Sequence, residues 1–137
     1  MSKPLPFADD TFDIIFHPVS NCYIEEVKTL WKECYRVLKK GGVLLSGLDI
    51  GINYLFDEEE KTLINTLPFN PLKNEEHLRQ MQKSNGGIQF SHTLEEQING
   101  QLEAGFTLLS LYDDTNGYGN LHEHNVVSYM ATKSIKL

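Results

Sequence analysis

The feature that most constrains this chain is a segment near its start in which two apolar runs flank an amphipathic stretch. Residues 12–16 (FDIIF) and 43–48 (VLLSGL) are mostly apolar, which is typical of strands that are covered on both faces. Between them, residues 24–38 carry apolar side chains at helical spacing, and Gly41-Gly42 ends the helix. A strand, a helix and a strand of this length predict a right-handed crossover between two parallel strands.

The rest of the chain predicts a helix, two strands and an irregular middle. We expect a helix over residues 93–104, a strand over 106–112 and a last strand over 126–132. The connection between the last two strands is short and has no helical pattern, so these strands should pair antiparallel. Residues 51–90 have weak periodicity, and only a short helix near 58–67 is expected there.

Composition sets broad limits. The chain has 137 residues, which suits one domain. Its formal net charge of −7, without a basic stripe, argues against a nucleic-acid partner. No apolar run approaches the roughly 20 residues that a membrane-spanning helix needs, and the start shows no signal-peptide pattern. Two cysteines make neither a disulfide framework nor a metal motif, so we expect a reduced, cytoplasmic protein.

Residues 5–48 resemble the middle of a class I methyltransferase that uses S-adenosylmethionine, of the type 11-like bacterial kind without an assigned substrate. LPF, an acidic turn and FDIIF resemble the approach to the family's fourth strand, and RVLKKGG with VLLS resembles its fourth helix and fifth strand. Gly105-Phe106 and the closing antiparallel pair resemble its last two strands. The resemblance implies one partial Rossmann-like domain over residues 1–137, with 51–90 as a variable insertion over the active-site end.

The resemblance implies S-adenosylmethionine as the cofactor, yet the family's glycine-rich cofactor loop does not occur in this sequence. The only Gly-x-Gly, residues 117–119 (GYG), follows an antiparallel strand and leads to no helical pattern. Residues 2–4 (SKP) stand where the family has an aspartate that contacts adenine, and the acidic residue that holds the ribose is absent too. We therefore expect a C-terminal portion, truncated before the cofactor-loop half, that is inactive or weak alone.

Candidate site residues follow from where this fold binds ligands, which is beyond the carboxyl ends of its strands. His17, directly after the first strand, is the candidate base that deprotonates a methyl acceptor; the alternative is that it contributes packing and backbone only. The resemblance implies contacts to the cofactor from Leu5, Phe7, His17 and Pro18. It implies substrate contacts from Ser20, Asn21, Asn53, Tyr54 and His122.

Other candidates have simpler interpretations. His122-Glu123-His124 has two possible metal ligands but no third nearby, so we predict no metal site. Cys22 is a possible nucleophile without an evident activating partner, and a small buried side chain is the simpler interpretation. The acidic residues 57–60 favour a solvated helix start over a carboxylate site.

Without the family's first strand, residues 12–16 should form an exposed sheet edge. An edge that is apolar on both faces invites pairing with another chain, so we expect either a fragment of a longer protein or a homodimer through Phe12–Phe16. Two functions remain open. The first is an S-adenosylmethionine-dependent methyltransferase of a small molecule, and the alternative is a non-catalytic α/β dimerisation or binding module.

Overall fold

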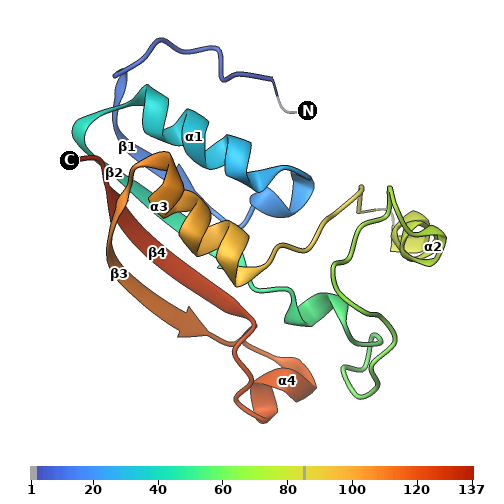
Figure 1. Ribbon diagram of the computed structural model, residues 1–137. Helices are drawn as coiled ribbons and strands as arrows, with labels where there is room; N and C mark the ends of the chain where they lie inside the picture. The colour runs from blue at the N-terminus through green and yellow to red at the C-terminus, as the bar shows by residue number, and fades with distance from the viewer. Residues whose placement is uncertain (1–2, 85) are drawn as a thin grey trace.

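The computed structural model describes residues 3–84 and 86–137 and has an α/β architecture built on a four-stranded sheet (Figure 1). The strands are β1 (Phe12–His17), β2 (Leu38–Asp49), β3 (Thr107–Asp114) and β4 (Tyr129–Ile135). Their order is β1-β2-β4-β3, with β1 and β2 parallel and β4 antiparallel to both of its neighbours. The expected fold class, a parallel pair with a crossover helix and a closing antiparallel pair, is confirmed.

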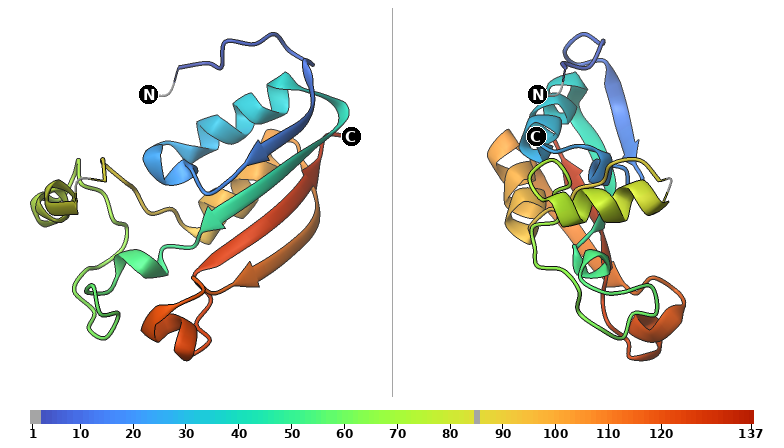
Figure 2. Two further views of the ribbon diagram at one scale, coloured as in Figure 1. Left: turned by 180° about the vertical axis from the view of Figure 1, so that it is seen from behind. Right: turned by 90° about the vertical axis from the view of Figure 1, so that its right-hand side faces the viewer.

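The helices lie on one face of the sheet or beyond its end. Helix α1 (Val27–Val37) is the crossover, and a π-helical turn (Glu95–Asn99) continues into α3 (Gly100–Ala104) on the same face. The right-hand view of Figure 2 shows both helices on one side of the strands. Helix α2 (Glu75–Ser84) lies away from the sheet, and short helical turns cover Asn21–Tyr23, Ile52–Tyr54 and, as α4, Gly119–Glu123.

Several expected elements are corrected. Residues 58–67 form no helix, because a turn brings Phe56 and Leu63 into an isolated antiparallel bridge. The polar residues 75–84 are helical as α2, where Asn74 accepts hydrogen bonds from the amides of the first turn. The expected loop between β3 and β4 contains α4, and the last strand begins at Tyr129 rather than at residue 126.

The core lies between the sheet and the α1–α3 layer. Trp31 of α1 and Leu38, Leu44 and Leu48 of β2 are completely buried. Gly100 permits the close approach of α3, because a Cβ atom there would lie 2.8 Å from Cδ1 of Trp31. The helix-breaking residue in the predicted 93–104 helix is therefore explained by packing.

The opposite face of the sheet is open. Ile14 and Phe16 of β1 lie on this face and are 63% and 72% exposed. They pair with Val43 and Leu45 of β2, which lie on the same face. On the far side of the same face, Tyr112 of β3 is 67% exposed. Strand β1 also lies at the edge of the sheet, as expected from the sequence.

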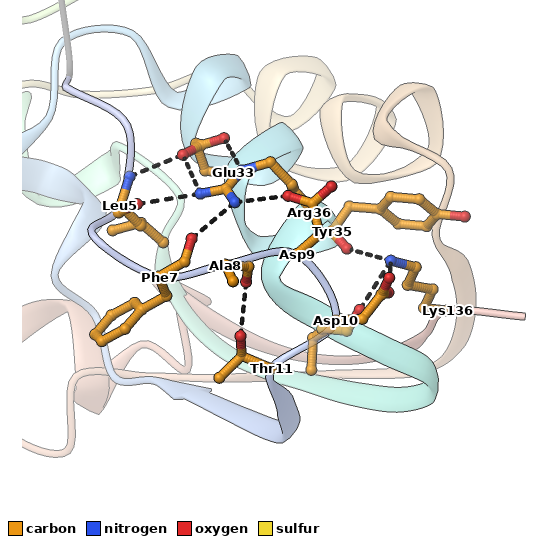
Figure 3. A network of polar contacts seen from close by, with 11 residues as sticks. Leu5, Phe7, Ala8, Asp9, Asp10, Thr11, Glu33, Tyr35, Arg36 and Lys136 are labelled. Atoms are coloured by element: carbon orange, nitrogen blue, oxygen red, sulfur yellow. Dashed lines mark hydrogen bonds and ion pairs between the residues drawn. The ribbon is translucent and has the colours of Figure 1, made fainter.

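A polar network joins the segment before β1 to the end of α1 (Figure 3). The Arg36 guanidinium donates to the backbone oxygens of Phe7 at 2.8 Å and Leu5 at 3.1 Å, and it bonds Glu33 and Asp9. The hydrogen bonds from Arg36 hold the pKa of Glu33 below its ordinary value. The Arg36 of the RVLKKGG motif thus fixes the N-terminal segment, which is a structural role.

Candidate functional site

The carboxyl ends of β1, β2 and β3, which run parallel to one another, lie at the end of the sheet where β4 begins. This end is called the carboxyl edge below and is distinct from the side of the sheet that the edge strand β1 forms. Asp49 ends β2 and Asp114 ends β3, and both are in register with Tyr129, the first residue of β4. The loops that follow β2 and β3 extend from this same edge (Figure 1). Ligands of open α/β sheets bind at this end.

A cavity of about 910 Å³ opens at this edge, between the segment after β2 and the loop between β3 and β4. Its walls combine aromatic, acidic and amide side chains. They are Asn53, Phe56, Asp57, Glu58, Glu59 and Glu60 from the first segment, Asn116, Tyr118, Gly119 and Asn120 from the loop, and Tyr129 from β4.

Glu60 holds the two walls together. Its Oε2 accepts from Nδ2 of Asn116 at 2.9 Å, and its backbone oxygen accepts from Nδ2 of Asn120 at 2.8 Å. Glu60 has a positive φ of 58°, which turns the chain toward the loop. Direct bonds therefore join the two walls, which come from segments about sixty residues apart in the sequence.

Asp49, at the end of β2, holds one of the residues that line the cavity. Its carboxylate accepts from the amide of Gly51 at 2.7 Å and from Nδ2 of Asn53 at 3.2 Å. Burial raises the pKa of Asp49, and burial together with the nearby Asp49 carboxylate raises the pKa of Tyr129. The Tyr129 hydroxyl is thus neutral at neutral pH, and Asn53 is held in a fixed orientation.

The candidate base His17 lies on the helix-covered face and not in this cavity. Its ring packs edge-on against Trp31, with 5.8 Å between centroids, and its Nδ1 lies 3.3 Å from Oγ of Ser20. Its Nε2 is buried without a partner among the described residues, and burial lowers its pKa. The ring is neutral, as a base requires, but its free nitrogen faces the protein interior, and its catalytic role stays a prediction.

The four residues expected at the cofactor are not gathered into one site. Backbone groups of Leu5 and Phe7 are bonded to Glu33 and Arg36. Pro18 lines a different cavity, of about 520 Å³, on the open sheet face. The structure therefore does not bring the four residues together around one ligand, and their contacts with S-adenosylmethionine stay a prediction.

The five residues expected at the substrate also separate. Only Asn53 lines the edge cavity. Asn21 is completely buried and donates to Gln97 at 3.0 Å. Tyr54 stacks on Phe69 and donates to Gln89, and burial raises its pKa.

Ser20 and His122 make local contacts. Oγ of Ser20 is within hydrogen-bonding distance of Nδ1 of His17, and Nδ1 of His122 lies 2.6 Å from Oγ1 of Thr115. The structure instead points to Glu60, Asn116 and Tyr129, which sequence reasoning missed. The acidic run at 57–60 and the Gly/Asn-rich loop were the available signals, but neither indicates that the two meet.

Alternative chemistries find little support in the described ranges, 3–84 and 86–137. No group of three or more His, Cys, Asp or Glu side chains could hold a metal ion there. Burial raises the pKa of the Cys22 thiol and raises that of Cys34 to about 12, so both thiols are protonated at neutral pH. Among the helices in these ranges, none has the length and apolar character needed to cross a membrane.

Comparison with known sequences supports the resemblance. The methyltransferase domain family matches residues 1–46. The chain is 36% identical over 138 residues to the uncharacterized methyltransferase YbaJ of Bacillus subtilis, which covers 96% of this chain and 53% of that protein. It is 32% identical over 119 residues to sterol methyltransferase-like 3 of Botryococcus braunii, which covers 85% of this chain and 26% of that protein.

Comparison with solved structures gives the fold. An S-adenosylmethionine-dependent methyltransferase from Mesorhizobium loti superposes with a TM-score of 0.71 at 14% identity, over 96% of this chain and 64% of its own. Geranyl diphosphate methyltransferase, in complex with S-adenosylmethionine, superposes with a TM-score of 0.59 at 12% identity, over 97% and 54%.

The fold is therefore that of part of a class I, Rossmann-like S-adenosylmethionine-dependent methyltransferase, and the resemblance found in residues 5–48 is confirmed. Among curated proteins the chain is related to YbaJ, and it spans about half of that relative's length.

Proposed function

We propose that this chain is the acceptor-binding portion of an S-adenosylmethionine-dependent methyltransferase that acts on a small molecule. In this proposal it has little or no activity until a polypeptide with the glycine-rich cofactor loop packs beside β1. The observation that carries the proposal is the edge strand β1, which exposes Ile14 and Phe16. Parallel sheets are normally covered on both faces.

The division of labour follows from which groups are available. S-adenosylmethionine supplies the activated methyl group when bound, and in this proposal the added polypeptide supplies the glycine-rich loop that holds it. The chain's own contribution is the cavity at the carboxyl edge, whose two walls Glu60 joins and in which Asp49 orients Asn53. Alignment of the acceptor in such a cavity is the main requirement of an in-line displacement.

The test is calorimetry with S-adenosylmethionine, first with this chain alone and then with an added polypeptide that carries the glycine-rich loop of a related methyltransferase. We expect no submillimolar binding by the chain alone, and measurable binding and methyl transfer by the mixture. Phe16→Lys, at the exposed edge, should prevent assembly without unfolding the chain, whereas Leu137→Lys, also exposed, is the control. Submillimolar binding by the chain alone would contradict the proposal.

The second candidate is a non-catalytic module that dimerises through Phe12–Phe16. The same exposed edge favours it, since an unprotected apolar edge pairs readily with a second copy. Sedimentation of the chain, first alone and then with the added polypeptide, separates the two candidates. A dimer of the chain alone that Phe16→Lys dissociates favours the module. A monomer that assembles only with the added polypeptide favours the methyltransferase. For either candidate we propose a cytoplasmic location, in keeping with the two free, buried cysteines.

A further inference from the structure

We infer that His92 is a proton-controlled lock at the carboxyl edge. With a proton on each ring nitrogen, His92 joins the turn Asn21–Tyr23, which follows β1, to the π-helical turn Glu95–Asn99. Loss of one of these protons breaks the bond to the turn after β1. The lock is a property of this chain alone and does not depend on the proposed function.

The first observation is that both ring nitrogens of His92 face oxygen atoms that accept hydrogen bonds. Nδ1 lies 3.1 Å from Oε2 of the Glu96 carboxylate, and Nε2 lies 3.0 Å from the backbone oxygen of Asn21. A neutral imidazole has one N–H donor, whereas the imidazolium has two. Both contacts are therefore hydrogen bonds only when the ring is doubly protonated. In the neutral ring, one nitrogen lone pair faces an oxygen lone pair.

The second observation is the burial of this contact. The side chain of His92 is 3% exposed, and Asn21 is completely buried. Water cannot replace a bond that the neutral ring fails to make, and a buried polar group without its partner loses stability through its desolvation. The protonation of His92 therefore decides whether its contact with the turn stabilises or destabilises this part of the chain.

The charges around His92 favour the cationic ring. Glu96 faces it from the π-helical turn, and Asp49 approaches it from β2: burial raises the pKa of Asp49, and the nearby His92 acts in the opposite direction. The turn Asn21–Tyr23 adds the titratable groups of Cys22 and Tyr23 but no carboxylate and no amine.

His92 also lines a cavity of about 390 Å³, whose other charged lining residues, apart from Glu96, are Glu25, Glu26, Lys28 and Lys73. Of the two lysines, Lys28 is paired with Glu103, since its Nζ lies 3.5 Å from Oε2 of that carboxylate. Acidic side chains thus outnumber basic ones around the ring, and an excess of negative charge favours a protonated histidine.

The two bonds of His92 differ in strength and in anchoring. The Glu96 carboxylate is a charged acceptor, which binds a donor more strongly than a neutral carbonyl does. The backbone oxygen of Glu96 also accepts from Nε1 of Trp31 at 3.1 Å, which fixes the π-helical turn on α1. A neutral His92 therefore keeps its proton on Nδ1 and loses the bond to Asn21. The Asn21 side chain still donates to Oε1 of Gln97 at 3.0 Å, so the turn is loosened but not released entirely.

The turn lies where its mobility matters. It follows β1 at the carboxyl edge, where open α/β sheets bind ligands. Gln97 joins it to the end of β2, because its Nε2 donates to the backbone oxygen of Asp49 at 2.9 Å. Histidine ordinarily changes its charge between about pH 5 and 8. The lock thus makes this edge of the sheet more rigid when His92 is protonated and looser as the pH rises.

The experiment follows the ring nitrogens of His92 by NMR while the pH is raised from about 6 to about 8.5, together with amide hydrogen exchange corrected for its intrinsic pH dependence. Both ring nitrogens should carry a proton at the low end, and only Nδ1 at the high end. Two amides report on the turn: that of Ile24, which donates to Asn21 at 2.9 Å, and that of Phe90, which donates to Cys22 at 2.7 Å. Their opening constants should rise about tenfold across the titration. A ring whose protonation does not change, or constant opening of both amides, would overturn the inference.

Variants assign the effect to its groups. His92→Gln carries no titratable group, so opening of the turn should no longer depend on pH, and a persistent dependence would overturn the inference. Glu96→Gln keeps an acceptor but removes the charge, so the ring should lose its proton at a lower pH; this variant tests the lock even if His92→Gln does not fold. Glu95→Gln, on an exposed neighbour in the same turn, is the matched control. An equal shift in Glu95→Gln would show a general charge effect and refute the pairing with Glu96.

Discussion

The two faces of the sheet differ sharply although the same strands supply both. On one face, Leu44 and Leu48 are completely buried under α1 and α3, in one core cluster with Trp31 of α1. On the other, Ile14 and Phe16 are as apolar but mostly exposed. The difference shows that apolar strands indicate a need for cover on two sides, whereas only the tertiary structure shows which side this chain covers with its own helices.

The largest change in the free energy of unfolding is expected for a substitution in the core beneath the covered face of the sheet. Trp31→Ala should destabilise the chain by about 3–5 kcal/mol, because it removes a completely buried aromatic side chain and leaves a cavity. The control is Phe16→Ala on the open face, which should change the free energy of unfolding by less than about 0.5 kcal/mol. Urea denaturation measures both. Equal losses would mean that the open face is covered in solution, by a second copy or otherwise.

The next effect tests how closely α3 packs on α1. Gly100→Ala should destabilise the chain by about 1–3 kcal/mol, because the added Cβ would lie 2.8 Å from the Trp31 ring. Helix propensity alone predicts the opposite, a gain of about 1 kcal/mol. Gly86→Ala, where a Cβ meets only ordinary contacts, is the control. A stabilised Gly100→Ala variant would show that the helix layer is looser than the structure indicates.

A smaller effect extends the comparison to the carboxyl edge. Glu60→Ala removes the side-chain bonds that Glu60 accepts from Asn116 and Leu121, keeps the bond from Asn120 to its backbone oxygen, and should cost about 1 kcal/mol of stability. Hydrogen exchange of residues 116–121 should accelerate while the amides of β2 keep their protection. Glu59→Ala, with an exposed side chain, is the control. Unchanged exchange at 116–121 would show that Glu60 does not hold the loop.

The smallest effect concerns the network around Arg36. Because the folded-state pKa of Glu33 lies below its ordinary value of 4.5, its contribution is fully present above pH 4.5 and is lost as the pH falls through the folded pKa. Protection of the Leu5 amide, which donates to Glu33, should decrease in the same range. Glu33→Gln should remove this pH dependence, and persistence in that variant would assign it to another group.

The sequence predicted the fold better than the site. Spacing along 12–48 indicated the crossover, and turn residues indicated the closing strand pair, since both signals are local. Asn53, which was expected to contact substrate, lines the cavity at the carboxyl edge, and its contact with substrate stays a prediction. The sequence could not show that Asn21 is a buried core residue and not a surface residue of the site. Its burial depends on a contact with Gln97, which lies 76 residues away in the sequence.

By itself, then, the sequence determined the strand and helix periods, the crossover and the expectation of an unpaired edge at β1, because these depend on neighbouring residues and on chain connectivity. The tertiary structure alone decided which sheet face is covered, where His17 points and that Glu60 meets Asn116. Those properties depend on contacts between distant segments, and such contacts are set by the order of strands in the sheet and by packing, which no local pattern records.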